Sequence, residues 1–148
     1  MNEAKWELNN LNKWKKTVKL LEETKDDLRD MRVAIVIDPN SLPGGSAHET
    51  VFNKMNRIVE QCANYDVIIK NYNFMINRIE KAMDELLNVE QKEVCYIYAN
   101  YSESIERESV ASKKGYTRAS YYRILNKSLE ILNEALLPSD TNLRLKQQ

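Results

Sequence analysis

One heptad stripe constrains the fold of this chain more than any other feature. Between Val51 and Leu86, apolar side chains recur at strictly alternating steps of four and three residues, and no glycine or proline interrupts residues 47–87. This spacing is typical of an α-helix whose apolar stripe faces a partner helix. At about 1.5 Å per residue, the helix would be roughly 60 Å long. The stripe comprises Val51, Met55, Ile58, Cys62, Tyr65, Ile69, Tyr72, Ile76, Ile79, Met83 and Leu86.

A second, shorter helical pattern precedes the stripe. Residues 4–31 carry apolar side chains at helical spacing, and residues 38–46 then hold two prolines and two glycines, which favours a loop. Ser46, with Glu49 three residues later, has the spacing of a capping box at the start of the long helix. These features predict a helical hairpin over residues 4–87, with the two helices antiparallel. The apolar positions of the first helix are Leu11, Trp14, Val18, Leu21 and Leu28.

The run Val33–Ile37 is rich in β-branched residues and can be either the last turn of the first helix or a short extended piece. Periodicity does not separate these two structures over five residues. We predict the extended form, because Pro39 follows closely.

The two helices of the hairpin differ in length, and this bears on assembly. The first helix is too short to cover the whole apolar surface of the second, so the remainder must pack on the C-terminal domain or on a second subunit. We predict a homodimer. The alternative is a long helix that breaks in two and buries its stripe within one chain.

Residues 105–132 have the pattern of a helix-turn-helix. Gly115 suits the left-handed conformation that closes a helix, and Thr117 follows as an N-cap for the next helix. Small Ala111 suits a close crossing of the two helices. Residues 89–101 predict one preceding helix, so that 89–137 would form a three-helix domain. The second helix of the motif carries Tyr121, Leu125, Leu129, Leu132 and Leu136 on one side.

The chain after this motif is expected to leave the helical fold. Pro138 is predicted to end the last helix, and residues 138–148 to form a flexible tail. The fold class is therefore all-α, with an oligomerising hairpin over residues 1–88 and a DNA-binding domain over 89–137.

Charge within the motif favours DNA binding. Five basic side chains and no acidic ones lie in the fifteen residues 113–127, although the whole chain has 22 basic and 22 acidic residues. A local basic patch is what phosphate contacts require. An amphipathic helix with a solvated basic face explains the charge equally well, but together with the glycine and the cap the pattern favours a DNA contact. Arg118 and Arg123 would read bases, and Lys113, Lys114 and Lys127 would contact phosphates.

Composition gives little support to other functions. The only histidine is His48, so the sequence lacks a multi-histidine metal site, and no pair of carboxylates is set apart for acid–base chemistry. Cys62 and Cys95 form no CxxC pattern and are interpreted as reduced, buried thiols of an intracellular protein. The N-terminus is polar and no apolar run could span a membrane. We expect a cytoplasmic protein that is not an enzyme and binds no cofactor, metal or membrane.

The chain resembles phage and prophage transcriptional regulators of the ArpU and RinA type, whose C-terminal part is similar to region four of bacterial sigma factors. The resemblance rests on the loop at residues 42–49, a helix around 94–98, and the segment 110–123 followed by 129–136. It implies activation of late phage genes for packaging and morphogenesis in a bacterial host. It leaves open whether RNA polymerase is a partner besides double-stranded DNA. By this match the DNA-facing side chains would be Thr117, Arg118, Ser120, Tyr122, Arg123 and Lys127.

Two alternatives remain on sequence grounds. The small subunit of a phage terminase also joins a helix-turn-helix to an oligomerising hairpin, but it forms rings that recruit a packaging motor. A helical adaptor would instead use the long apolar stripe to bind a partner protein and would have no affinity for DNA.

Overall fold

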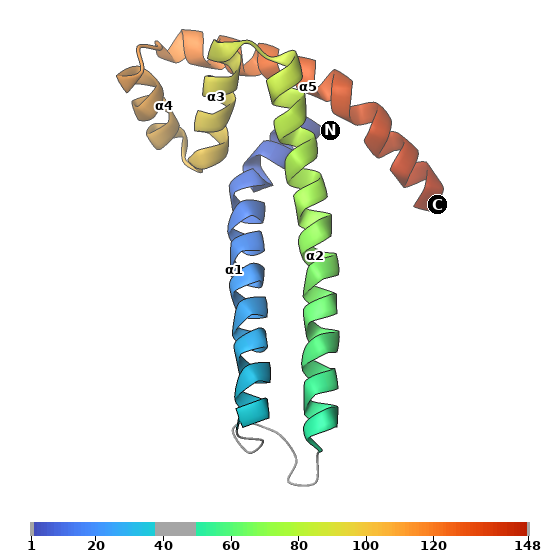
Figure 1. Cartoon of the computed structure of the whole chain (residues 1–148). Helices are drawn as coiled ribbons and strands as arrows, with labels where there is room; N and C mark the ends of the chain where they lie inside the picture. The colour runs from blue at the N-terminus through green and yellow to red at the C-terminus, as the bar shows by residue number, and fades with distance from the viewer. Residues whose placement is uncertain (1, 38–49, 148) are drawn as a thin grey trace. The chain divides into compact units, whose positions relative to one another are not determined.

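A computed structural model describes residues 2–37 and 50–147, with side chains over 2–34 and 50–136, and it is helical with no strand in those ranges. The all-α fold class is confirmed. The helices are α1 (Glu3–Ile37), α2 (Val51–Leu86), α3 (Val89–Asn100), α4 (Ser104–Lys113) and α5 (Arg118–Gln147), as Figure 1 shows.

The chain forms two compact units that do not follow the predicted boundary at residue 88. One unit comprises residues 15–74, and the other comprises residues 1–14 together with 75–148. The difference arises because the first turns of α1 and the last turns of α2 belong to the core that α5 completes. Leu8, Ile79, Met83 and Leu132 of the second unit are all fully buried.

The unit of residues 15–74 is a pair of helices, and we call it the hairpin unit. Within it α1 and α2 lie side by side (Figure 1), with Ile58 buried among side chains of both helices. Lys25 Nζ of α1 lies 2.7 Å from Asp66 Oδ1 of α2. At Ile58 the predicted stripe is therefore covered within one chain, and α2 does not break. The side chains that pack on Ile58 are Leu28, Met31, Val51, Met55 and Cys62.

The run Val33–Ile37 is helical and forms the end of α1, so the prediction of an extended piece was wrong. Each β-branched residue lowers helix stability by only a fraction of a kcal/mol, roughly 0.7 at most, and adding residues to an existing helix is favourable. A proline restricts the residue directly before it, which is residue 38 and not residue 37.

The start of α2 differs in its cap from the sequence prediction. The predicted capping box of Ser46 and Glu49 lies outside the described residues. The described helix begins at Val51, and Thr50 Oγ1 accepts a hydrogen bond of 3.1 Å from the backbone N–H of Asn53. Thr50 thus satisfies one of the free N–H groups at this helix start.

The last helix runs through Pro138 to Gln147, so the prediction that it ends at Pro138 was wrong. Proline has no N–H for the carbonyl of Glu134, and its ring crowds that carbonyl. The lost bond weakens the helix at this point without forcing it to end.

The unit of residues 1–14 and 75–148 is closed by contacts between the two ends of the chain, and we call it the closed unit. The backbone N–H of Ala4, in the first turn of α1, donates to Asn133 Oδ1 of α5 at 2.9 Å. Asn133 Nδ2 in turn donates to Asn2 Oδ1 at 3.0 Å. The free N–H groups at a helix start need acceptors, and here a side chain 129 residues away supplies one.

A buried ion pair lies in the same unit. Arg78 Nη2 of α2 donates to Glu7 Oε1 of α1 at 2.8 Å. The Glu7 side chain has no exposed surface, and that of Arg78 is 19% exposed. A buried carboxylate depends strongly on such a partner, because desolvating it alone costs several kcal/mol, on the order of 5 or more.

Candidate nucleic-acid interface

The turn between α4 and α5 is closed by Gly115 in the way that the sequence predicts. Gly115 has φ of 93°, and it is the only described glycine with a positive φ. Its N–H donates to the carbonyl of Ser112, and the N–H of Tyr116 donates to the carbonyl of Ala111, both at 3.0 Å. These two bonds form a Schellman motif, which satisfies the last carbonyls of α4 and turns the chain sharply.

Thr117 caps the helix that follows. Its hydroxyl accepts a hydrogen bond of 3.1 Å from the N–H of Ser120, and the carbonyl of Thr117 accepts from Tyr121 N at 2.8 Å. This local chemistry fixes the start of α5 three residues after Gly115. The turn therefore holds α4 and α5 at a defined junction.

Replacing Gly115 should weaken the unit through its backbone alone. No atom lies within 4 Å of the position a Cβ would take, so contact with neighbours does not contribute. Gly115→Val should lower the free energy of unfolding by about 1–2 kcal/mol, because β-branched side chains resist the left-handed conformation. Gly115→Asn should cost less, because asparagine tolerates that conformation. Urea unfolding followed by circular dichroism measures both, and equal stability of the two variants would contradict this account.

The inner side of α5 anchors the junction. Leu125, Leu129, Leu132 and Leu136 are buried, as is Tyr121, and α5 packs against both α3 and α4. The facing side chains are the buried residues of α3, with Ala111 at the contact with α4, namely Val94, Cys95, Ile97, Tyr98, Ala99 and Ala111. This core holds one side of α5 and leaves the other side in solvent.

α3 is itself capped at its start, as the structure shows and the sequence analysis did not predict. The Asn88 side chain accepts from the N–H of Gln91 at 2.8 Å, and the Gln91 side chain accepts from the N–H of Asn88 at 3.0 Å. This reciprocal pair is a capping box with asparagine in place of serine. The cap allows α3 to begin at Val89, with only two residues between it and the end of α2 at Leu86.

Most of the predicted DNA-facing residues lie on the solvent side. Lys113, Lys114, Thr117, Arg118, Arg123 and Lys127 are exposed, whereas Ser120 and Tyr122 are half-buried. On α5, Arg123 and Lys127 are four residues apart and lie opposite the buried leucines, whereas Tyr122 lies about 100° around the helix from Arg123, on the side of its partner Glu108. The turn and the outer face of α5 thus form one surface, which we call the basic face.

Glu108 of α4 engages two of these residues. Its Oε1 lies 3.2 Å from Arg118 Nε and accepts a 2.7 Å hydrogen bond from the Tyr122 hydroxyl. That hydrogen bond, together with partial burial, raises the pKa of Tyr122 above its ordinary 10.0, so the phenol remains a donor. Arg118 and Tyr122 are therefore held against α4 by an acidic neighbour that is not predicted by the sequence.

The other basic residues differ in how they are engaged. Lys127 lies 3.7 Å from Glu130, but both side chains are well exposed, and such pairs contribute little. Among the described residues Lys113 and Arg123 have no ion pair. These two cations are the ones best placed to meet an external anion.

Asn126 was missed by sequence reasoning. It is exposed on α5, three residues after Arg123 and four after Tyr122, so it lies on the basic face. An uncharged amide gave no signal in an argument based on charge. Its exposure was nevertheless predictable from the helical period, because it lies at a polar position between the buried Leu125 and Leu129.

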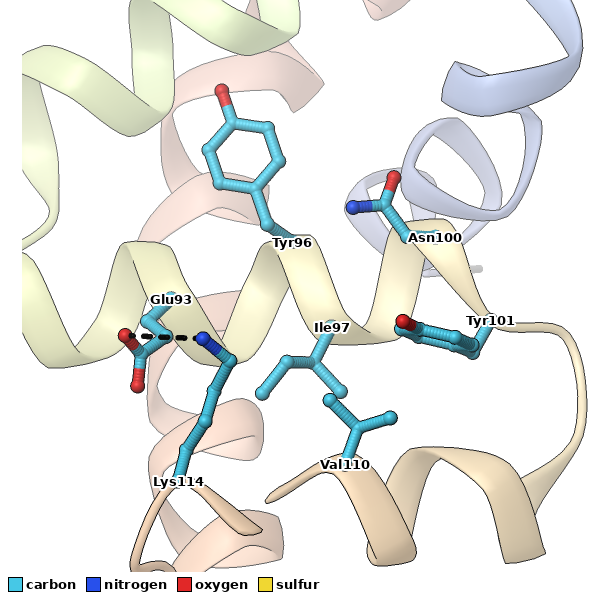
Figure 2. Close-up of a pocket in the computed structure, with 7 residues that line it drawn as sticks. All are labelled: Glu93, Tyr96, Ile97, Asn100, Tyr101, Val110 and Lys114. Carbon is cyan, nitrogen blue, oxygen red and sulfur yellow. Dashed lines mark ion pairs between the residues drawn. The ribbon is translucent and has the colours of Figure 1, made fainter.

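A groove of about 330 Å³ lies between α3 and α4, beside the basic face. Figure 2 shows Lys114 reaching across from the end of α4 toward Glu93 of α3, with Nζ and Oε2 4.0 Å apart. Lys114 therefore points toward α3 rather than along α5, although both side chains of this pair are exposed and the contact contributes little. The groove is lined by Glu93, Tyr96, Ile97, Asn100, Tyr101, Val110 and Lys114.

Cys95 is buried and Cys62 is half-buried, and neither is in a disulfide. Within residues 2–34 and 50–136, His, Cys, Asp and Glu side chains form no cluster of three that could hold a metal ion. Over the described part of the chain, no helix is both long and apolar enough to cross a membrane.

Comparisons of this chain with protein-family models, with curated proteins and with solved structures give no match.

Proposed function

We propose that this chain is a sequence-specific, double-stranded DNA-binding regulator of transcription that places the start of α5 in the major groove. The exposed face of α5 is the observation that carries the proposal. It presents hydrogen-bonding side chains to solvent, while the buried leucines hold the opposite side on α3 and α4. A helix entering the major groove needs one fixed side and one side free to contact base edges.

The distribution of charge supports this orientation. Residues 89–136 contain seven basic and seven acidic side chains, but five of the basic ones lie within 113–127, where no acid occurs. The acidic residues precede or follow that segment. The domain is thus neutral overall and polarised along the chain, which favours one approach to a phosphate backbone.

We assign separate roles to the residues of the basic face. Arg123 can take guanine through two hydrogen bonds, and Asn126 can take adenine in the same way. Lys113 and Lys127 lie at the two ends of the acid-free segment, where they can contact phosphates and set the register on the duplex. Arg118 would reach DNA only by leaving Glu108, so we place it second to Arg123.

The biological context follows from the resemblance to the ArpU and RinA regulators. On that basis we propose a phage or prophage protein of the bacterial cytoplasm that activates late genes for packaging and morphogenesis. The helix-turn-helix, formed by α4, the turn and α5, corresponds to the part that resembles region four of sigma factors. A contact with RNA polymerase belongs to the same proposal.

The test starts from DNA fragments selected by the purified protein from random and phage sequence. Arg123→Ala should weaken binding to the selected site by roughly 5–150-fold, the equivalent of about 1–3 kcal/mol for a lost bidentate base contact. Non-specific binding should change little. Arg32→Ala, on the exposed side of α1 in the hairpin unit, is the matched control and should bind as wild type.

A phosphate contact has a different signature in the same titration. Lys113→Ala should weaken specific and non-specific binding together, and should make the slope of log K against log salt shallower by about 0.9. Lys19→Ala, an exposed lysine of α1, is the control. If folded Arg123→Ala and Lys113→Ala proteins both bind like wild type, α5 does not contact DNA and the helical adaptor becomes the better account. A ring-sized mass with DNA affinity would point instead to a terminase small subunit.

A further inference from the structure

α2 carries a second apolar stripe within the hairpin unit, on a side away from α1. Large apolar side chains remain in solvent at four positions, with exposed fractions of 71% for Phe52, 46% for Val59, 60% for Val67 and 61% for Phe74. Ala63 is exposed as well. Exposed Asn56 and Lys70 lie on the same side of the helix and interrupt the stripe at two positions. Apolar surface gathered on one side of a folded unit marks a contact with another molecule.

Helix geometry separates this stripe from the one that packs on α1. At 100° per residue, the five residues lie within a sector of about 80°, and its centre is roughly 130° from Ile58 and Ile69. Ile58 and Ile69 are buried, and Ile58 packs on side chains of α1. α1 therefore cannot cover the second stripe, which we call the outer stripe.

The outer stripe is symmetric about Ala63. Val59 and Val67 lie four residues to either side of it, and Phe52 and Phe74 lie eleven residues to either side. A two-fold dimer requires a surface that complements itself, so that residue i meets residue j and j meets i. A stripe that reads the same in both directions meets this requirement when two copies run antiparallel.

We propose that the outer stripe of α2 binds the outer stripe of a second copy of this chain, antiparallel, with the two-fold axis at Ala63. Phe52 of one copy then faces Phe74 of the other, and Val59 faces Val67. The small alanine at the axis lets the two helices approach closely. The proposed dimer contact lies entirely in the hairpin unit and does not depend on the proposed DNA contact.

Charged residues in and beside the stripe fit the antiparallel register, in which Lys70 of one copy faces Asn56 of the other. Lys70 of one copy comes within about one helical turn of Glu60 of the other, so opposite charges meet at the edge of the contact. Asp66 lies on the opposite edge of the helix from Glu60, and it is already paired with Lys25 of its own chain. The two carboxylates therefore do not oppose each other across the interface.

The exposed phenylalanines supply part of the area that a dimer interface uses. The two phenylalanines of one copy together leave roughly 260 Å² in solvent, when each side chain carries about 200 Å². That is a third of the approximately 800 Å² per partner in a standard interface, before the valines, the alanine and the flanking polar residues are added.

Sedimentation equilibrium of the full chain at micromolar concentrations tests the contact. Wild type should be a dimer, and Val67→Glu should raise the dimer dissociation constant by about tenfold or more, because each copy would bury a charge. Ile68→Glu is the matched control, since Ile68 is 42% exposed on α2 but lies outside the outer stripe. It should leave the dimer intact, and circular dichroism should show both variants to be helical. A monomeric wild type, or a dimer that Val67→Glu leaves unchanged, overturns the proposal.

Cysteine cross-linking tests the register in a Cys62→Ala background. Ala63→Cys should form a disulfide with its own copy under mild oxidation. Phe52→Cys and Phe74→Cys should cross-link when mixed but not singly, because positions 52 and 74 are about 33 Å apart along the helix. Cross-linking of Phe52→Cys with itself would mean a parallel pair and would overturn the antiparallel arrangement.

Discussion

Replacing Arg78 by methionine is expected to lower the free energy of unfolding by about 3–5 kcal/mol, the usual cost of removing one partner of a buried ion pair. Arg78 Nη2 lies 2.8 Å from Oε1 of Glu7, whose side chain is completely buried. Methionine keeps the apolar stem of arginine but removes the guanidinium that donates to the buried carboxylate. Urea unfolding at neutral pH, where the carboxylate is ionised in the unfolded chain, measures the loss.

A double variant separates the charge effect from packing. Glu7→Leu combined with Arg78→Leu removes both charges, and apolar replacement of a buried pair is often neutral or stabilising. We expect the double variant to recover most of the stability that Arg78→Met loses. A double variant as unstable as the single one would show that the side chains act by shape and not by charge.

Alkaline pH should destabilise the closed unit through Cys95. Burial raises the pKa of the Cys95 thiol from 9.0 to about 12, against a smaller opposing effect of its hydrogen bond with Ser128. Below pH 9 the thiol is protonated in both the folded and the unfolded chain, and its contribution to stability is fully present. Between pH 9 and 12 only the unfolded chain releases the proton, so stability falls by about 1.4 kcal/mol per pH unit, on the order of 4 kcal/mol in total.

The measurement compares wild type with Cys95→Ala under reducing conditions. Cys95→Ala should be less stable at neutral pH, because it leaves space in the core. Its stability should then fall less steeply between pH 9 and 12, by about 1.4 kcal/mol per unit, since the titrating thiol is gone. Tyrosines and lysines titrate in both proteins and cancel in the comparison. Parallel pH profiles would contradict a buried thiol with a raised pKa.

The parts of the fold that the sequence predicted well depend on local chemistry. The turn at Gly115 and the cap at Thr117 are determined by single residue types within one short segment. The buried leucines of α5 follow from a period of 3.6 residues, which any amphipathic helix displays. Such features need no knowledge of what lies opposite them.

The features that the sequence did not predict depend on distant partners. Glu7 and Glu108 look like ordinary solvated glutamates in the sequence, yet one is buried with Arg78 and the other engages Arg118. The boundary at residue 88 was placed where the heptad stripe ends and the next helical pattern begins, whereas the closed unit is assembled from both ends of the chain. Local patterns carry no information about such pairings.

The same limit applies to the apolar surface of α2. The first helix was predicted to cover part of this surface and a second subunit or the C-terminal domain the remainder, but the sequence did not indicate which residues belong to each part. Ile58 of the heptad stripe packs on α1 of the same chain. The residues left for another molecule include Phe52 and Val67, which lie outside the heptad positions. A period identifies an apolar side of a helix but not which neighbour covers it.

The hydrogen bond from Ala4 to Asn133 has a consequence for biosynthesis. The two residues are 129 positions apart, so at about 5–20 residues per second a ribosome makes the acceptor roughly 6–26 s after the donor. During that time the first turns of α1 cannot form this hydrogen bond with α5. The hairpin unit is contiguous in sequence and can form while translation continues. Folding on the ribosome should therefore start in the middle of the chain and finish with α5, and a ribosome paused before residue 133 should carry a protected hairpin with an unprotected N-terminus.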